Sequence, residues 1–80
     1  MDTKYLMRYA AEGKWSYFML GSSAPGKTEY PTNGEASSKR EAERYCREAV
    51  KSLRSSGGVV KFAYVLPPKG SDKDLIKKIA

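Results

Sequence analysis

Residues 37–56 hold the longest regular alternation of apolar and polar positions in the chain, and this pattern predicts one amphipathic helix. Apolar side chains recur there every three or four residues, the spacing that places them on one face of an α-helix. These apolar positions are Ala42, Tyr45, Cys46, Ala49, Val50 and Leu53. Ser38 with Glu41 fits a capping box at the start, and the Gly57-Gly58 pair fits a left-handed residue after the end.

A period of two, typical of β-strands, appears in three other segments. We expect strands at residues 4–11, 15–20 and 59–66. A turn at Gly13, which can take a positive φ, is expected to join the first two strands as an antiparallel hairpin.

The remaining segments complete the predicted fold. Residues 21–36 contain Gly and Pro repeatedly and are interpreted as a loop, with room for a short strand at residues 27–30. Ser71 is expected to cap a short C-terminal helix. The whole chain, residues 1–80, is thus predicted to be one α+β domain: a three-stranded sheet with one long helix packed on one face, in the order β-β-α-β, plus the short C-terminal helix.

Alternation also assigns two faces to the predicted sheet. The larger and more apolar face is expected to pack on the helix, and it contains Tyr5, Met7, Tyr9, Trp15, Tyr17, Met19, Val60, Phe62, Tyr64 and Leu66. The other face places four cations around Phe18, namely Lys4, Arg8, Lys14 and Lys61. Such a face is either an ordinary half-solvated surface or a surface that holds phosphates and stacks on a base.

The polar side of the predicted helix carries five cations, which we call the cation row: Arg40, Arg44, Arg47, Lys51 and Arg54. At 100° per residue they fall within an arc of about 80°. Their mutual repulsion costs a few tenths of a kcal/mol per pair, and Glu41, Glu43 and Glu48 relieve part of it. The row is therefore either a solvated helix face or a surface for a polyanionic partner.

Composition narrows the possible functions. Fifteen Lys and Arg against nine Asp and Glu give a net charge of +6, which favours nucleic acid or an acidic protein as a partner. With no His and only Cys46, which we expect to be a buried apolar residue, the chain offers neither a zinc site nor the usual general base. We therefore expect no enzyme, cofactor or metal. The sequence shows no apolar run of signal-peptide or membrane-spanning length, so we expect a cytoplasmic protein without a membrane partner.

Residues 21–28 match the phosphate-loop pattern G-x-x-x-x-G-K-[ST] in full. That motif binds phosphate at the start of a helix, and the residues that follow here include Pro31 and Gly34, which cannot continue one. We interpret the segment as a mobile loop that offers one useful cation, Lys27.

Three motifs lie between residues 13 and 45. They are Gly13-Lys14-Trp15-Ser16-Tyr17-Phe18, Gly26-Lys27-Thr28 and Ser37-Ser38-Lys39-Arg40-Glu41-Ala42-Glu43-Arg44-Tyr45. This combination of a Lys-Trp strand, a basic loop and a helix start resembles the arm-type DNA-binding domain of phage and transposon integrases. Members of that family pack a small twisted sheet on one helix and insert the sheet into the major groove. The resemblance implies that Lys14, Ser16 and Phe18 are candidates for groove contacts.

These observations lead to two functional hypotheses. The first is a small basic module that binds nucleic acid, with DNA favoured over RNA, and holds phosphates through the cation row or through the sheet face around Phe18. The second is a protein-binding module or inhibitor of phage or mobile-element origin that docks on an acidic or nucleic-acid-binding protein, since the strand-strand-helix-strand order is also similar to small phage-encoded inhibitors. An exposed edge strand would in addition allow two copies to pair.

Overall fold

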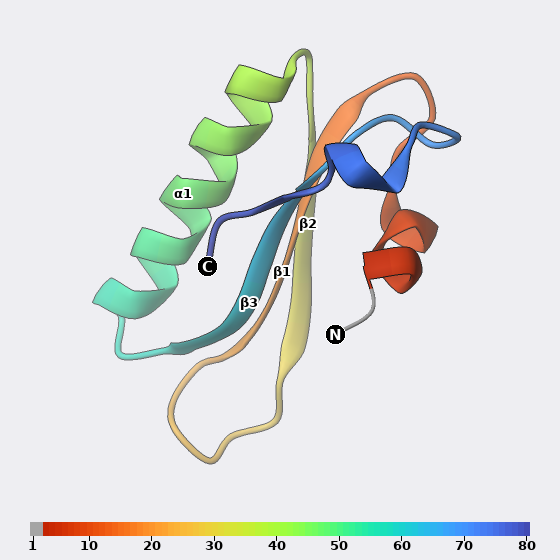
Figure 1. The fold of residues 1–80 in the computed structure, drawn as a ribbon. Coiled ribbons are helices and arrows are strands. Elements are labelled where there is room, and N and C mark those ends of the chain that lie inside the picture. Colours follow the sequence, from red (N-terminus) through yellow and green to blue (C-terminus); the bar gives the residue numbers. More distant parts are fainter. Residues whose placement is uncertain (1–2) are drawn as a thin grey trace.

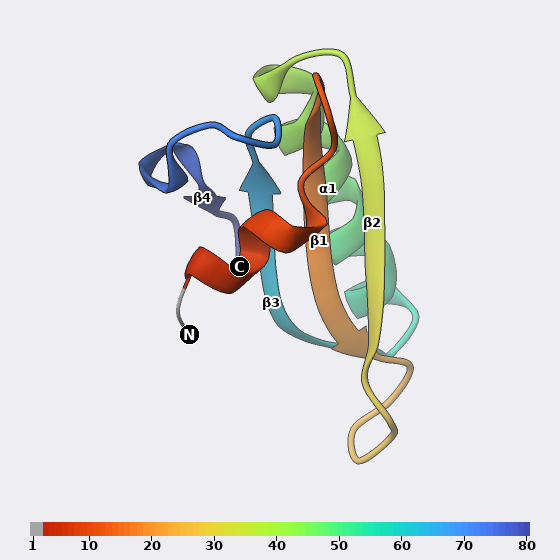
Figure 2. The same ribbon diagram turned by 90° about the vertical axis from the view of Figure 1, so that its right-hand side faces the viewer.

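An antiparallel sheet forms the middle layer of the protein in its computed structural model, which describes residues 3–80, with side chains from Tyr5 onward. Within these residues the sheet has four strands, in the order β2-β1-β3-β4. In chain order the elements are the 3-10 helix η1 (Thr3–Tyr9), β1 (Trp15–Ser22), β2 (Tyr30–Ala36), α1 (Lys39–Ser55), β3 (Val59–Leu66), the 3-10 turn η2 (Lys73–Leu75) and β4 (Lys77–Lys78). Helix α1 covers one face of the sheet and η1 lies on the other (Figure 1, Figure 2). The α+β class with one long helix is confirmed. Two of the three expected strands form, as β1 and β3, and β2 and β4 complete a sheet of four strands instead of three.

Local hydrogen bonds fix both ends of α1, as the sequence predicted. The backbone N–H of Glu41 donates to the Ser38 hydroxyl at 3.1 Å, which makes Ser38 the N-cap. After the last turn Gly57 has a φ of +89°, and the N–H of the next residue donates to the Leu53 carbonyl at 2.9 Å, the pattern of a Schellman motif. None of the helices within the described residues is long and apolar enough to cross a membrane.

The segment 21–36, predicted to be a loop, instead contains strand β2, which pairs with β1 from Trp15↔Ala36 to Gly21↔Tyr30. The Gly and Pro residues that indicated a loop are compatible with this strand because it lies at the edge of the sheet. Pro31 can occupy an edge strand, where a missing N–H need not break a ladder. At Gly34 a Cβ atom would lie 2.7 Å from the Tyr17 ring, so the ring occupies the space that a side chain would need.

The N-terminal segment 4–11, predicted to be a strand, forms η1 instead. Leu6 and Ala10 are both buried, and their spacing of four suits a helix as well as a strand. Gly13 has the expected positive φ, +69°, but its turn joins η1 to β1 and not two strands of a hairpin. The apolar residues of this short segment fit both a helix and a strand, and it forms a helix because Leu6 and Ala10 pack against the sheet.

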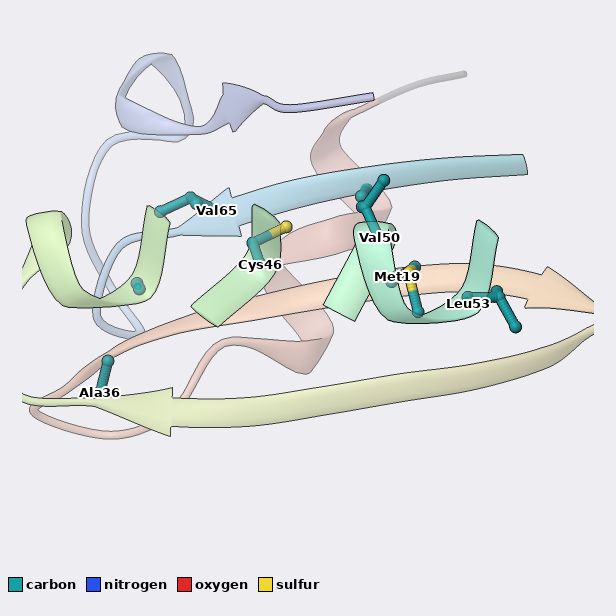
Figure 3. Close-up of a cluster of buried hydrophobic side chains, with 8 residues drawn as sticks. Met19, Ala36, Cys46, Val50, Leu53 and Val65 are labelled. Carbon is teal, nitrogen blue, oxygen red and sulfur yellow. The ribbon is translucent and has the colours of Figure 1, made fainter. Parts of the chain in front are cut away.

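Two apolar clusters hold the layers together. Between α1 and the sheet lie Met19, Ala36, Ala42, Cys46, Val50, Leu53, Ala63 and Val65 (Figure 3). Between η1 and the sheet lie Leu6, Ala10, Phe18 and Leu66. The apolar face predicted for the helix is therefore the face that α1 buries.

The predicted sheet faces are right for β1 and wrong for most of β3. The residues of β1 that pack on the α1 side are Trp15, Tyr17 and Met19. The residues of β3 that lie on the η1 side, against the prediction, are Phe62, Tyr64 and Leu66. Ala63 and Val65 face α1 instead. The prediction assumed that only one face is covered, so it gave the larger side chains to the helix. Because η1 covers the second face, the larger rings pack there, and the small Ala63 lies beneath α1.

The C-terminal segment forms a short helical turn, as expected, but Asp72 caps it and not Ser71. The Asp72 carboxylate accepts a hydrogen bond from the N–H of Asp74 at 2.9 Å. Lys77 and Lys78, which follow this turn, form β4 and extend the sheet beyond β3. The last residues continue along β3, where the N–H of Ile79 donates to the Ala63 carbonyl at 2.9 Å.

Candidate nucleic-acid interface

The cation row occupies the solvent side of α1, and all five of its side chains are exposed. The opposite side of the helix carries the buried residues Ala42, Cys46, Val50 and Leu53, so the sheet holds the row facing outward. From Arg40 to Arg54 the row extends about 21 Å along the helix axis at 1.5 Å per residue. The ion pairs among the described side chains are Lys14–Glu35, Lys61–Glu29 and Lys77–Glu43, and none of them includes a member of the row.

Two of the three acids on α1 are bound to groups outside the row. The carboxylate of Glu41 accepts a hydrogen bond from the backbone N–H of Ser37 at 3.1 Å, and this contact is the main reason why the pKa of Glu41 lies below its ordinary value. The carboxylate of Glu43 lies 2.9 Å from the Lys77 ammonium, which lowers the pKa of Glu43 chiefly through that hydrogen bond. Neither carboxylate forms an ion pair with a member of the row, although Arg44 lies close enough to Glu41, and Arg47 to Glu43, to lower the pKa of that carboxyl slightly.

The cation row is made mostly of Arg and not of Lys, and the helical period alone does not reveal this difference. Four of the five arginines in the chain belong to the row, whereas nine of the ten lysines lie elsewhere. A guanidinium group binds phosphate through two parallel hydrogen bonds and stacks on planar groups, which an ammonium cannot do. The guanidinium Cζ of Arg44 lies 5.3 Å from the centre of the Tyr45 ring, which is a cation–π contact.

A groove of about 480 Å³ lies beside the C-terminal half of the row. We call it the α1–Ile79 groove, and its lining residues are Arg47, Val50, Lys51, Arg54, Ser55 and Ile79. It combines an apolar floor, Val50 and Ile79, with three cations at its rim. This groove was not predictable from the sequence, because the C-terminal segment was expected to be helical, whereas strand β4 brings Ile79 next to α1.

The second surface proposed from the sequence, the sheet face around Phe18, is not open to a ligand. Phe18 is only 5% exposed, and the ring of Tyr9 from η1 stacks on it with centroids 4.3 Å apart. Arg8 belongs to η1 and not to a strand, and its guanidinium carbon lies 5.8 Å from the centre of the Tyr5 ring. The side chain of Lys4 lies outside the part of the chain whose side chains are described.

The other cations of the predicted site are distributed over the sheet and the hairpin loop. Lys14 pairs with Glu35 at 3.8 Å and Lys61 pairs with Glu29 at 3.4 Å. Lys27 is exposed in the loop between β1 and β2, and that loop continues into a strand and not into a helix, unlike a phosphate loop. These three lysines lie outside α1 and do not extend the cation row.

The three motifs that resemble the integrase arm-type domain fall on β1, on the hairpin loop and on the N-terminal part of α1. Of the side chains that the resemblance implies for groove contacts, Ser16 is 3% and Phe18 5% exposed, whereas Lys14 is exposed. No protein-family model, curated protein or solved structure matches the chain.

Proposed function

We propose that this protein binds nucleic acid through the cation row of α1. The observation that supports the proposal is the alignment of five exposed cations, four of them Arg, that form no ion pair with any described carboxylate. A regular polyanion matches such a row better than an isolated anion does, because each phosphate along a strand finds a cation.

The fold supports this role by fixing the row before a ligand arrives. The apolar face of α1 is buried against the sheet, so the helix presents its cations in one direction without rearrangement. Binding releases counterions from the nucleic acid, and for B-DNA the logarithm of the affinity falls by about 0.9 per phosphate contact for each unit of log salt. Full engagement of the row therefore gives a slope of about −4.5.

Charge reversal tests this directly. We expect the double variant Arg44→Glu/Arg47→Glu to weaken binding of a DNA duplex or single strand by about tenfold or more at low salt and to flatten the salt slope by about 2. Fluorescence polarisation at several salt concentrations measures both quantities. The matched control is Lys69→Glu/Lys73→Glu, which makes the same change of net charge at exposed positions outside α1.

The control variant distinguishes the row from the overall charge of the protein. Equal losses in the two double variants would mean that net charge alone drives binding, and the proposal would then be wrong. An acidic protein surface is the alternative partner for the same row. It predicts no nucleic-acid binding and the capture of one protein from a lysate that nuclease treatment leaves unchanged.

A further inference from the structure

We infer that the α1–Ile79 groove makes the cation row selective for single-stranded nucleic acid over a duplex. The inference rests on the proposed function of the row and adds the class of ligand that the row prefers. Its basis is the combination, in one groove, of unpaired cations with an apolar floor.

The floor of the groove is held in place by several contacts. The backbone of Ala63 in β3 accepts a hydrogen bond from the N–H of Ile79 at 2.9 Å and donates one to the Ala80 carbonyl at 2.9 Å. Two residues earlier, the Lys77–Glu43 ion pair joins β4 to α1. The side chain of Ile79 therefore meets α1 in a defined position, and the groove exists before a ligand binds.

The cations at the rim of the groove and the apolar side chains of its floor would bind two different parts of one ligand. Arg47, Lys51 and Arg54 at the rim attract an anion, because none of them is paired with a described carboxylate. Val50 and Ile79 below them gain from contact with an apolar surface. The volume, about 480 Å³, lies within the range of small-ligand pockets, so the groove can hold more than a phosphate group.

A single strand offers both phosphates and exposed base faces, whereas a duplex offers its phosphates but keeps its base faces stacked inside. In a duplex the faces of the bases are stacked inside, so a protein helix on its surface meets phosphates and base edges. In a single strand each phosphate is followed by an unpaired base, whose face can cover the apolar floor or stack on a guanidinium plane. Because the floor is aliphatic and not aromatic, we expect a preference of several-fold and not of several orders of magnitude.

An acidic peptide with an apolar side chain would also offer an anion beside an apolar group. The structure favours nucleic acid for two reasons. The row continues past the groove to Arg44 and Arg40 at the same regular spacing, which suits a repeating polyanion. Four of its five members are Arg, the side chain that both forks onto phosphate and stacks on bases.

The experiment compares oligothymidine of about 12 nucleotides with a duplex of about 12 base pairs, by fluorescence polarisation at about 0.1 M salt. We expect the unmodified protein to bind the single strand about threefold or more tightly than the duplex. Ile79→Ser removes apolar floor and keeps every charge, so it should weaken single-strand binding about fivefold and leave duplex binding within about twofold. The control is Leu75→Ser, which removes a similarly apolar side chain from η2 at an exposed position outside the groove and should change neither affinity.

A second variant tests the groove by a gain of affinity, which partial unfolding cannot imitate. Ser55→Tyr adds an aromatic ring to the lining and should raise single-strand affinity several-fold without a matching gain for the duplex. Equal affinity of the protein for both oligonucleotides, unchanged by Ile79→Ser, would overturn the inference and leave the row as a duplex-tolerant site. Binding of neither would refute the proposed function itself. Competition by polyglutamate as effective as that by oligothymidine of equal charge would also overturn the inference, because it would show that bases contribute nothing.

Discussion

Burial controls the chemistry of Cys46, the single cysteine of the chain. Its side chain is fully buried between α1 and the sheet, and this desolvation raises the pKa of the thiol to about 11. The thiolate, which is the reactive form, is therefore scarce at neutral pH.

We expect Cys46 to react with a thiol reagent at about pH 8 at least on the order of a hundredfold more slowly in the folded protein than in denaturant. With an aromatic disulfide as the reagent, the absorbance of the thiolate that the reagent releases follows the reaction. Similar rates in both states would show that α1 separates readily from the sheet, and a rigidly presented cation row would then be excluded.

The Glu43–Lys77 ion pair makes the stability of the fold depend on pH. Lys77 holds the pKa of Glu43 below its ordinary value of 4.5, so the unfolded state binds this proton more tightly than the folded state does. The contribution of the pair is therefore present above about pH 4.5 and lost as the pH falls below that value.

We expect Glu43→Gln to reduce the loss of unfolding free energy between neutral and acid pH, and Lys77→Met to reduce it by a similar amount. The double variant should show the same reduced pH dependence of the unfolding free energy as either single variant, because both substitutions remove the same interaction. Urea unfolding curves at several pH values measure these differences. Additive effects of the two substitutions would contradict a direct ion pair between α1 and β4.

At the level of single elements, the N-cap determines where α1 begins and thus how much of the cation row is helical. Replacing Ser38 by Ala leaves an N–H of the first turn without its side-chain acceptor, and we expect it to lower the free energy of unfolding by about 1 kcal/mol. Ser38→Asp keeps an acceptor at this position and should restore most of the loss. Urea denaturation provides the measurement, and an unchanged midpoint for Ser38→Ala would mean that the cap does not hold the helix.

Elements with a long and capped pattern were predictable from the sequence, whereas those decided by tertiary packing were not. Helix α1 and strand β3 matched their expected positions because many residues repeat one period. Strand β2 was missed because Pro31 and Gly34 usually indicate a loop, and only its place at the sheet edge allows them. For η1, a short apolar segment fits both periods, and its contact with Phe18 decides the outcome.

The same distinction applies to the candidate site. The cation row could be placed from sequence, since the helical period alone puts five residues on one side of α1. The sheet face around Phe18 could not be judged, because its accessibility depends on η1, which comes from a different part of the chain. The α1–Ile79 groove likewise depends on a pairing between β4 and β3 that no local pattern indicates.

On the scale of the whole molecule, the two covered faces of the sheet differ in what they present outward. The α1 side presents the cation row, and the η1 side presents the partly exposed rings of Tyr5 and Tyr9. The molecule measures 35 × 24 × 16 Å, and α1 lies along one face of the sheet while the loop between β1 and β2 extends beyond the helix (Figure 1). A polyanion attracted to the row would therefore meet the protein in one orientation.

The edges of the sheet bear on the expectation that two copies pair. Strand β2 forms the longer of the two edges and carries Pro31 and the charged Glu35, and the two-residue β4 forms the other. Proline and charged side chains on an edge strand oppose pairing with another strand. The homodimer remains a prediction, and the composition of β2 gives it no support.

Nuclear magnetic resonance can locate the bound ligand on the molecule. In a titration of the labelled protein with unlabelled oligothymidine, we predict shifts of the Arg side-chain Nε–H signals of Arg40, Arg44, Arg47 and Arg54, together with the backbone amides of α1 and of Ile79. Arg8, the one arginine outside the cation row, is the internal control and should keep its signal. Shifts of Arg8 and of η1, with the four arginines of the row unchanged, would contradict binding through α1.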